Sequence, residues 1–428
     1  MKKPAAVTML TLLLLSHLPS TNAQTPDSCF GIDAGGVITK YICTDNHVEI
    51  PATISGRSVV GIGKNVFYNR NLISAQIPKG ITTIGDSAFQ YNKLTSIQLP
   101  SSVNSIGDNA FADNGLTSVQ IPNIMTTIGD SVFARNNLRS LQLPDGIISI
   151  GFGAFESNHL TTVQIPSSVI KIGARAFEGN FLNNILLPDH LATIENSAFS
   201  GNHLASIQIP SSVTVIEALA FNSNYLESVQ LSGSLITIGF GAFGGNQLTS
   251  IQIPESVISI EDGAFAFNKL TSVQIPKNVK RIGGVAFTHN QLTSVQIAYG
   301  VTTIGYNAFS DNLLSSVQIP DSVSTIEYEA FRSNKLNSIH IPDSVRTIGE
   351  YAFSCNPITS VQIAYGVVTI GDYAFANDSI TSVQIPSTVA SIGKGAFTAN
   401  WIKSVLVPKS VTSLDANAFD PNVVISRI

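Results

Sequence analysis

A single 22-residue stretch contains the whole pattern of this chain: Leu94-Thr95-Ser96-Ile97-Gln98-Leu99-Pro100-Ser101-Ser102-Val103-Asn104-Ser105-Ile106-Gly107-Asp108-Asn109-Ala110-Phe111-Ala112-Asp113-Asn114-Gly115. Ile97 and Leu99 alternate with polar neighbours, which predicts a strand with one buried face. Pro100 follows at once and ends the strand, because proline has no N–H to donate. Residues 103–106 predict a second short extended or turn segment, and residues 108–112 leave room for one helical turn.

The phenylalanine of this stretch recurs at a fixed interval. Phe67 and Phe419 are 352 residues apart, which is sixteen intervals of 22 without an insertion or a deletion. The positions are Phe67, Phe89, Phe111, Phe133, Phe155, Phe177, Phe199, Phe221, Phe243, Phe265, Phe287, Phe309, Phe331, Phe353, Phe375, Phe397 and Phe419. A unit this short cannot bury its apolar residues alone, so we expect parallel stacking at ~4.8 Å per coil, with like residues in ladders.

From Phe89 onward an asparagine follows almost every phenylalanine of the series, three residues later. The series from Asn92 to Asn422 is broken only by Asp378. Because an asparagine side chain both donates and accepts hydrogen bonds, we expect this ladder to satisfy backbone groups of its own and the next coil. Gly107 and its equivalents alternate with glutamate in other coils, so they are not left-handed positions. They are expected to allow close approach of neighbouring coils.

Composition excludes several classes of protein. The 428 residues carry 23 basic and 28 acidic side chains, a formal charge of −5, and charged residues make up only 12%. This lacks the basic surplus that nucleic-acid binding needs. Hydrophobic residues at 44% exclude a disordered chain. Three cysteines are too few for a disulfide-stapled scaffold or an ordinary zinc finger.

The first 23 residues predict a secretory signal peptide. Lys2 and Lys3 precede an apolar stretch over residues 5–18, and Ala23 ends a small-residue cleavage site. The apolar stretch is too short to span a membrane, and no other segment reaches the required length, so no membrane span is expected in the mature chain. Export permits disulfides, and Cys29 and Cys43 are the natural pair, closing a hairpin. Cys355 is left over and is expected to be a partly buried free thiol.

The pattern Leu-Thr-Ser-Val/Ile-Gln-Ile-Pro-x-Ser-Val-x-x-Ile-Gly-x-x-Ala-Phe resembles the BspA-like (Treponema-type) leucine-rich repeat, with good copies at 248–265 and 270–287. The resemblance implies a β-rich solenoid, a right-handed superhelix of about 17 coils of 22 residues with a short N-terminal cap. The expected division is a signal peptide over 1–23, a cap hairpin over 24–47, the repeat array over 48–422 and a C-terminal end over 423–428. The family also implies an extracellular or cell-surface protein whose partners include host matrix proteins.

Reactive groups do not converge in the repeat pattern. His159 and His203 share a repeat position but lie two coils apart, which is about 10 Å and too far for one metal ion. No serine, histidine and aspartate fall at matching positions on adjacent coils, and without insertions no long loop is available to form a pocket. We therefore expect no catalytic residues, no cofactor and no metal site.

Breaks in the uniform pattern are the candidate contact residues. The position before each strand leucine reads His159, Phe181, His203 and Tyr225 over four consecutive coils, and coil spacing places these rings in a row. Leu186 replaces a ladder glutamine nearby, and Trp401 occupies the ring position close to the C-terminus. Exposed aromatic runs often mark interaction sites. The alternative is drift at a tolerant position, since isolated exposed apolar residues are common.

The sequence thus predicts a secreted or surface protein that mediates binding to proteins or cells, adhesin-like and without catalysis. Its partner is expected to be an extracellular protein or a cell-surface ligand, with host matrix proteins as candidates. Two alternatives remain open. One is a structural envelope or spacer role, favoured by the uniform exposed strand positions with serine and glutamine in most coils. The other is a glycan-binding module that uses the aromatic row.

Overall fold

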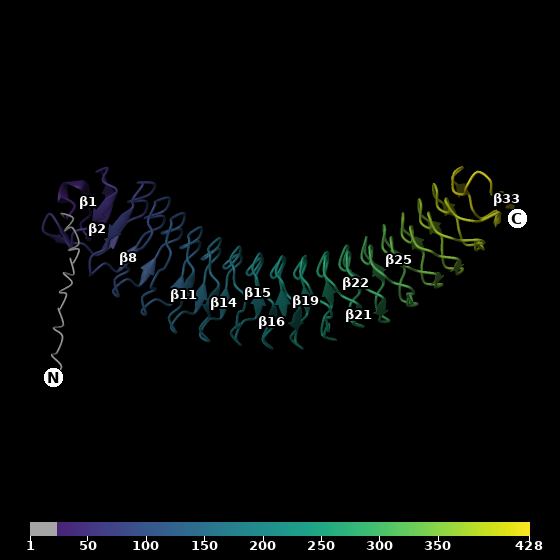
Figure 1. Ribbon diagram of the computed structural model, residues 1–428, viewed down its shortest axis with the longest axis horizontal. Helices are drawn as coiled ribbons and strands as arrows, with labels where there is room; N and C mark the ends of the chain where they lie inside the picture. Colours follow the sequence, from purple (N-terminus) through teal and green to yellow (C-terminus); the bar gives the residue numbers. More distant parts are fainter. Residues whose placement is uncertain (1–23) are drawn as a thin grey trace, which may run out of the picture.

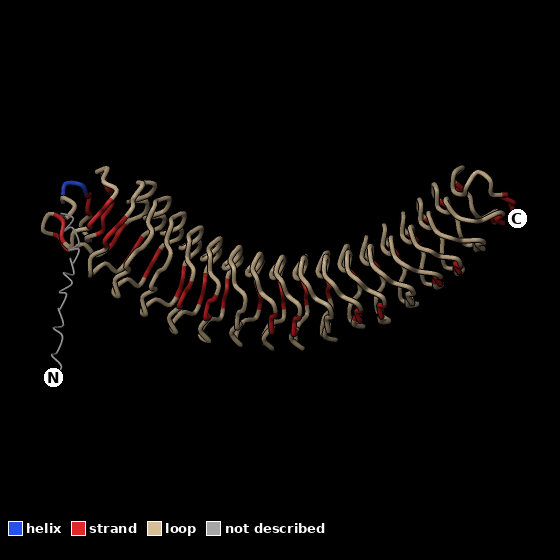
Figure 2. Tube along the Cα trace, viewed as in Figure 1, coloured by secondary structure: helices blue, strands red, loops and turns tan. Residues whose placement is uncertain are grey.

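The computed structural model describes residues 24–428, and the predicted signal peptide lies outside them. The repeat coils stack into one long arc with the chain ends at opposite tips (Figure 1). Most of each coil is loop, interrupted by short strands, and the single helix among these residues is a 3₁₀ turn, η1 (Asp27–Cys29) (Figure 2). The predicted β-rich solenoid is confirmed, with one coil for each phenylalanine of the repeat pattern.

The first strands form a cap on the array. The antiparallel pair of β1 and β2 joins the solenoid because β2 runs parallel to β6 of the first coil. The disulfide between Cys29 and Cys43 closes this hairpin, as predicted. The strands of this region are β1 (Phe30–Ile32), β2 (Val37–Tyr41), β3 (His47–Glu49), β4 (Thr53–Ile54) and β5 (Arg57–Ser58).

The second extended segment of each coil, at residues 105–106 of the quoted stretch, builds the more continuous sheet. Its strands pair in parallel, each residue with its equivalent in the next coil, as Ile216 does with Ile238, and one run contains eleven strands. These short strands are β6 (Gly61–Ile62), β8 (Thr83–Ile84), β9 (Ser105–Ile106), β10 (Thr127–Ile128), β12 (Ser149–Ile150), β14 (Lys171–Ile172), β15 (Thr193–Ile194), β17 (Val215–Ile216), β19 (Thr237–Ile238), β20 (Ser259–Ile260), β22 (Arg281–Ile282), β24 (Thr303–Ile304), β25 (Thr325–Ile326), β27 (Thr347–Ile348), β29 (Thr369–Ile370), β30 (Ser391–Ile392) and β32 (Ser413–Leu414).

The first extended segment, which carries the exposed serine and glutamine, pairs only two coils at a time. We call the exposed surface of these segments the strand face. The pairs are β3 with β7 (Ser74–Gln76), β11 (Ser140–Gln142) with β13 (Thr162–Gln164), β16 (Ser206–Gln208) with β18 (Ser228–Gln230), β21 (Ser272–Ile275) with β23 (Ser294–Ile297), β26 (Ser338–Ile341) with β28 (Ser360–Ile363), and β31 (Ser404–Val407) with β33 (Val424–Arg427). The quoted stretch itself forms no strand at 96–99, so the prediction of a strand there is wrong for that coil.

The curvature of the arc accounts for this pairing. In the second half of the array the paired strands, such as β21 and β26, lie along the outer, convex side (Figure 2). Coils on the outside of an arc are spaced more widely than on the inside, and a ladder hydrogen bond needs strands ~4.8 Å apart. Neighbouring coils therefore keep that spacing in pairs, and the extra distance collects in the gaps between pairs.

Two ladders stand out in the interior, beside the buried leucine, isoleucine, valine and alanine residues of each coil. Phenylalanine rings from Phe67 to Phe419 stack with centroids 4.9–5.8 Å apart and nearly parallel planes. Tyr41 and Phe30 of the cap extend the stack by two further rings, at 5.2 and 5.5 Å. The cap therefore covers the first ring of the array.

The asparagine ladder hydrogen-bonds to the backbone of its own and the preceding coil. Asn136 is typical: its Nδ2 donates to the carbonyls of Phe111 and Phe133, at 2.9 and 3.2 Å, and its Oδ1 accepts from the N–H of Leu116 at 3.0 Å. The expected structural role is confirmed, with the preceding coil in place of the next one. The coil spacing on this side is thus fixed by buried hydrogen bonds. Each contributes about 1 kcal/mol net to the free energy of unfolding, and its loss costs more because a buried polar group is left unpaired.

Two left-handed residues shape the turn that carries each phenylalanine. In the quoted coil these are Asn109 and Asp113, each with φ of 58°. Cys355 occupies the second position, with φ of 60°, and its side chain is exposed, so the prediction of a partly buried thiol is wrong. Gly107 is close to its neighbour coil, as predicted: a Cβ there would lie 2.5 Å from the nitrogen of Asp86.

Removing the cap disulfide with the double substitution Cys29→Ser and Cys43→Ser is expected to destabilise the cap by about 3 kcal/mol, because it frees a loop of about 15 residues in the unfolded chain. Hydrogen exchange should accelerate in β1 and β2 and remain slow in the middle of the array, since repeats are stabilised by their neighbours. Cys355→Ser is the control and should change stability by less than about 0.5 kcal/mol. Equal effects from both variants would contradict the assigned role of the disulfide.

Candidate functional site

The predicted aromatic row, His159, Phe181, His203 and Tyr225, is assembled as expected. Successive ring centroids lie 5.5, 5.1 and 5.2 Å apart. All four side chains are exposed, Phe181 by 41% and Tyr225 by 52%. The row is thus a continuous ring surface along four coils.

The backbone under the aromatic row is fixed by the solenoid. Each residue of the row donates its N–H to the carbonyl of a leucine in the preceding coil. His159 donates to Leu138, Phe181 to Leu160 and Tyr225 to Leu204, at 2.9, 2.9 and 3.1 Å. The next residue after each is a fully buried leucine of the core. The rings are therefore held on a rigid scaffold, which reduces the entropy lost when a partner binds.

Ring orientation determines what the aromatic row presents to solvent. His159 and Phe181 stack with planes 16° apart, while the two following pairs are tilted by 45° and 48°. Neighbouring rings therefore lie against one another along the row, and the two inner rings, Phe181 and His203, have a neighbour on both sides. Ring edges carry the positive part of the aromatic quadrupole and suit apolar, aromatic or carbonyl groups.

Leu186 and Trp401, the other two predicted contact residues, do not form a single surface together with the aromatic row. Leu186 is 82% exposed in the coil of Phe181, five residues further along, and it lies in a segment that forms no strand. Trp401 is 70% exposed but lies eight repeats beyond Tyr225, near the exposed Leu406. Trp401 therefore belongs to a separate region at the C-terminal end of the array.

Glutamine and threonine side chains on the strand face differ in their hydrogen bonding. Threonine hydroxyls donate to the preceding coil, as Thr293 does to the carbonyl of Thr271 at 3.2 Å. Among the described residues, no hydrogen bond is formed by the side chains of the strand-face glutamines, from Gln98 to Gln384. The threonine side chains thus hydrogen-bond along their own ladder, whereas the glutamine amides are free to bind a ligand.

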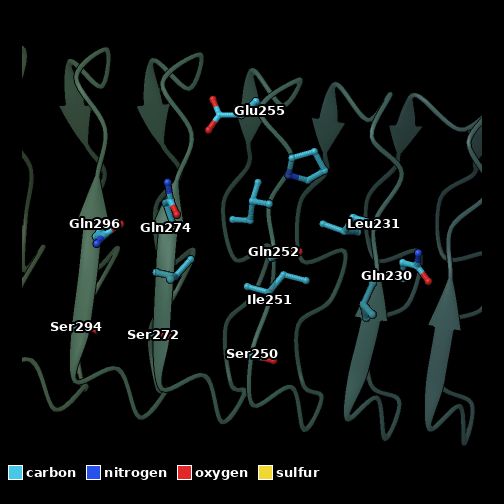
Figure 3. A pocket seen from close by; sticks show the side chains of 14 residues that line it. Gln230, Leu231, Ser250, Ile251, Gln252, Glu255, Ser272, Gln274, Ser294 and Gln296 are labelled. Atoms are coloured by element: carbon cyan, nitrogen blue, oxygen red, sulfur yellow. The ribbon is translucent and has the colours of Figure 1, made fainter.

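Shallow hollows form where the strand face is unpaired. The segment 250–253 is a thin trace between the paired strands β16–β18 and β21–β23 (Figure 3). A hollow of about 880 Å³ lies over it, with Ile251 and Ile253 in its floor and Gln230, Gln274 and Gln296 around it. Two further hollows lie over the unpaired segments 118–121 and 316–319. Wide coil spacing therefore creates concave sites on an otherwise flat face.

The unpaired segments recur every third coil, which the sequence analysis did not detect. From β11 onward each pair is followed by one unpaired coil, at 184–187, 250–253, 316–319 and 382–385. A signal is present in the sequence, because the strand-ending proline is replaced by Ser232, Ala298 and Ala364, which stand three repeats apart. The N–H groups of Ala298 and Ala364 donate to the preceding coil at 3.3 and 3.1 Å, which extends the pairing by one bond.

A charged cluster connects several coils at the second extended segment of the repeat and the turn that follows it. Arg281 donates to Asp262 and Glu327, both at 3.1 Å, and the hydroxyl of Tyr306 donates to Asp262 at 3.0 Å. The Tyr306 ring passes over Gly284, where a Cβ would lie 2.1 Å from it. Because these groups hydrogen-bond to one another, the cluster fastens neighbouring coils together.

The histidines of the aromatic row do not form a metal site. His159 and His203 are separated by the ring of Phe181, and within residues 24–428 no three His, Cys, Asp or Glu side chains come together to hold a metal ion. No helix in the same range has the length and hydropathy needed to cross a membrane.

Comparison with known proteins identifies the repeat. A family model described as a BspA type leucine-rich repeat region matches residues 60–183, 214–335 and 302–425, in six copies. No curated protein sequence matches the chain.

Solved structures of leucine-rich repeat proteins resemble the fold. A leucine-rich repeat protein from Bacteroides ovatus is 25% identical, with a TM-score of 0.61, and the match covers 92% of this chain and 94% of that one. YopM from Yersinia enterocolitica is 17% identical over 87% of this chain and 84% of its own, with a TM-score of 0.44. A leucine-rich cell surface protein from Faecalibacterium prausnitzii is 22% identical over 93% and 92%, with a TM-score of 0.34.

Proposed function

Because this chain belongs to the BspA-type leucine-rich repeat family, we propose that it is an exported, non-catalytic recognition protein that binds an extracellular protein or a cell-surface ligand through the aromatic row. The observation that carries the proposal is the row itself, four exposed rings from consecutive coils held 5.1–5.5 Å apart on a rigid backbone. Exposed aromatic side chains of this kind are typical hot spots of protein interfaces.

Export is supported by two features of the N-terminal region. The sequence of residues 1–23 has the charged, apolar and small-residue parts of a signal peptide. The cap contains the Cys29–Cys43 disulfide, a bond that persists in oxidising compartments outside the cytosol. A surface or secreted location would bring the aromatic row into contact with host matrix proteins or other cells.

Ring orientation favours a protein partner over a glycan. Sugar rings bind aromatic residues by stacking on an open face, and in the aromatic row the faces of Phe181 and His203 are turned toward neighbouring rings. A protein side chain can contact the exposed parts of these rings instead. A purely structural spacer would not require four exposed rings in sequence. Both alternatives give distinct outcomes in the test below.

Replacing Phe181 and Tyr225 with serine is expected to weaken binding at least about tenfold, because each ring is an exposed anchor of the proposed interface. The measurement is surface plasmon resonance against a purified extracellular matrix preparation, and against purified cell-wall glycan. The control replaces Phe152 and Phe240 with serine, since these rings are equally exposed but lie on another segment of the coil.

Loss of binding to matrix protein in the Phe181/Tyr225 variant alone supports the proposal. Loss of glycan binding alone would establish the glycan-binding alternative. Binding that is absent in the native chain, or unchanged in both variants, would exclude the aromatic row as a contact site and favour the spacer role.

A further inference from the structure

A second row of exposed side chains lies at the turn after the strand face. Tyr299, Asp321, Asp343 and Tyr365 occupy the same repeat position in four consecutive coils, the place of Ser101 in the quoted stretch. Both tyrosines are strongly exposed, by 75% and 63%, and both aspartates are exposed. We call this the tyrosine–aspartate row. It places two adjacent carboxylates between two aromatic rings.

Local backbone chemistry fixes the turns that carry the tyrosines. Ala-Tyr-Gly replaces the usual proline turn at 298–300 and 364–366. Gly300 has φ of 146° and its N–H donates to the Ser322 hydroxyl at 3.1 Å. A Cβ at Gly300 would lie 2.2 Å from the Lys277 carbonyl oxygen, so only glycine fits. The tyrosines therefore project from tightly packed turns instead of mobile loops.

A hollow of about 440 Å³ adjoins the first half of the row. Val295, Ile297 and Ile319 supply apolar surface, Gln296 and Gln318 supply free amides, and Tyr299 and Asp321 complete the lining. This hollow lies over the unpaired segment 316–319. It therefore offers an apolar floor next to a carboxylate and an aromatic ring.

The two carboxylates have no cationic partner within the described part of the chain. No ion pair or side-chain hydrogen bond involves Asp321 or Asp343. The guanidinium of Arg346 donates instead to the carbonyl of Gly366, at 2.7 Å. Lys277 holds the same repeat position one coil before Tyr299. A pair of like charges on neighbouring coils favours a positively charged ligand at this position.

We propose that the tyrosine–aspartate row and its hollow bind arginine side chains of an extended polypeptide partner. The carboxylates accept hydrogen bonds from the guanidinium groups, the tyrosine rings flank them, and the apolar floor receives the methylene groups. Alternate residues of an extended peptide lie on one side of the chain, so two arginines placed two residues apart face the row together. This inference rests on the proposed function as a polypeptide-binding protein.

The test uses a synthetic peptide, acetyl-Gly-Arg-Gly-Arg-Gly-amide, and the same peptide with citrulline, which keeps the shape of arginine without its charge. Titration calorimetry of the full mature chain should show binding of the arginine peptide about tenfold tighter than the citrulline peptide at low salt. Asp321→Asn with Asp343→Asn should remove that difference. Tyr299→Ala with Tyr365→Ala should reduce it to about threefold.

The matched control is Asp145→Asn with Asp189→Asn, which removes the same charge from exposed residues at the same repeat position that have no flanking tyrosines. It should bind the arginine peptide like the native chain. Equal affinity for the two peptides would overturn the proposal. An equal loss of arginine-peptide affinity in the control would also overturn it, because the overall charge of the protein would then explain the binding. The Phe181/Tyr225 variant should keep arginine-peptide binding. The proposal for the aromatic row and the proposal for the tyrosine–aspartate row can therefore fail independently.

Discussion

Replacing Asp378 with asparagine is expected to stabilise the array by about 6 kcal/mol at pH 9 and to have almost no effect at pH 4. Asp378 stands in the asparagine ladder, where Oδ1 accepts from the N–H of Asn356 at 2.8 Å and Oδ2 is buried without a partner. A carboxylate has no amide hydrogen to donate to the carbonyls of Phe353 and Phe375, which an asparagine would contact. Burial raises the pKa of the Asp378 carboxyl to about 8 from an ordinary value of 3.8.

The sign of the pH dependence follows from this shift. Between about pH 4 and pH 8 the unfolded chain has lost the proton while the folded chain keeps it, so stability falls as pH rises and levels off above pH 8. Guanidinium denaturation of the native chain and of Asp378→Asn at several pH values checks the prediction. A constant difference between the two across this range would show that Asp378 is ionised in the fold at every pH.

Replacing Phe221 with alanine is expected to destabilise the middle of the array by about 4 kcal/mol, because a fully buried ring is lost and a cavity remains. The ring stacks on Phe199 and Phe243, at 5.6 and 5.5 Å, so both neighbours lose contacts as well. Since each coil contacts only its neighbours, the weakened interface should divide the solenoid into two units that unfold separately. Denaturation monitored by hydrogen exchange should therefore show two transitions in place of one.

The last ring of the ladder is the control for this prediction. Phe419 stacks on Phe397 alone, at 5.2 Å, with no coil of the ladder beyond it. Phe419→Ala should thus cost about half as much and leave the middle of the array unchanged. Equal effects at Phe221 and Phe419 would contradict a stability that is the sum of neighbour contacts.

The architecture was predictable because the constant 22-residue interval between phenylalanines can be read from the sequence without knowing the conformation of the chain. A repeat interval without exception requires that Phe111 lie over Phe89, and the asparagine ladder follows from the same spacing. The aromatic row was predictable for that reason too, since His159 and Phe181 share a repeat position. Their ring angles were not, because these depend on side-chain packing at an exposed surface.

The repeat pattern alone could not predict which coils pair along the strand face. Whether Ser96 or Ser140 begins a strand depends on the spacing between coils, and that spacing depends on the curvature of the whole arc. Proline marks most strand ends, so its replacement at Ala298 was a usable but overlooked signal. The tyrosine–aspartate row was missed for a related reason, because each of its residues is ordinary within its own coil.

The three-coil rhythm has a consequence for how such a protein can change in length. A genetic duplication or loss of three whole repeats leaves every coil beside neighbours of the same paired or unpaired kind, whereas a change of one repeat displaces all downstream pairs by one. The N-terminal third, where 96–99 and 118–121 are both unpaired, has the form that such a displacement produces. We therefore expect that adding or removing three repeats preserves any binding site that depends on a gap between pairs, and that adding or removing one repeat does not.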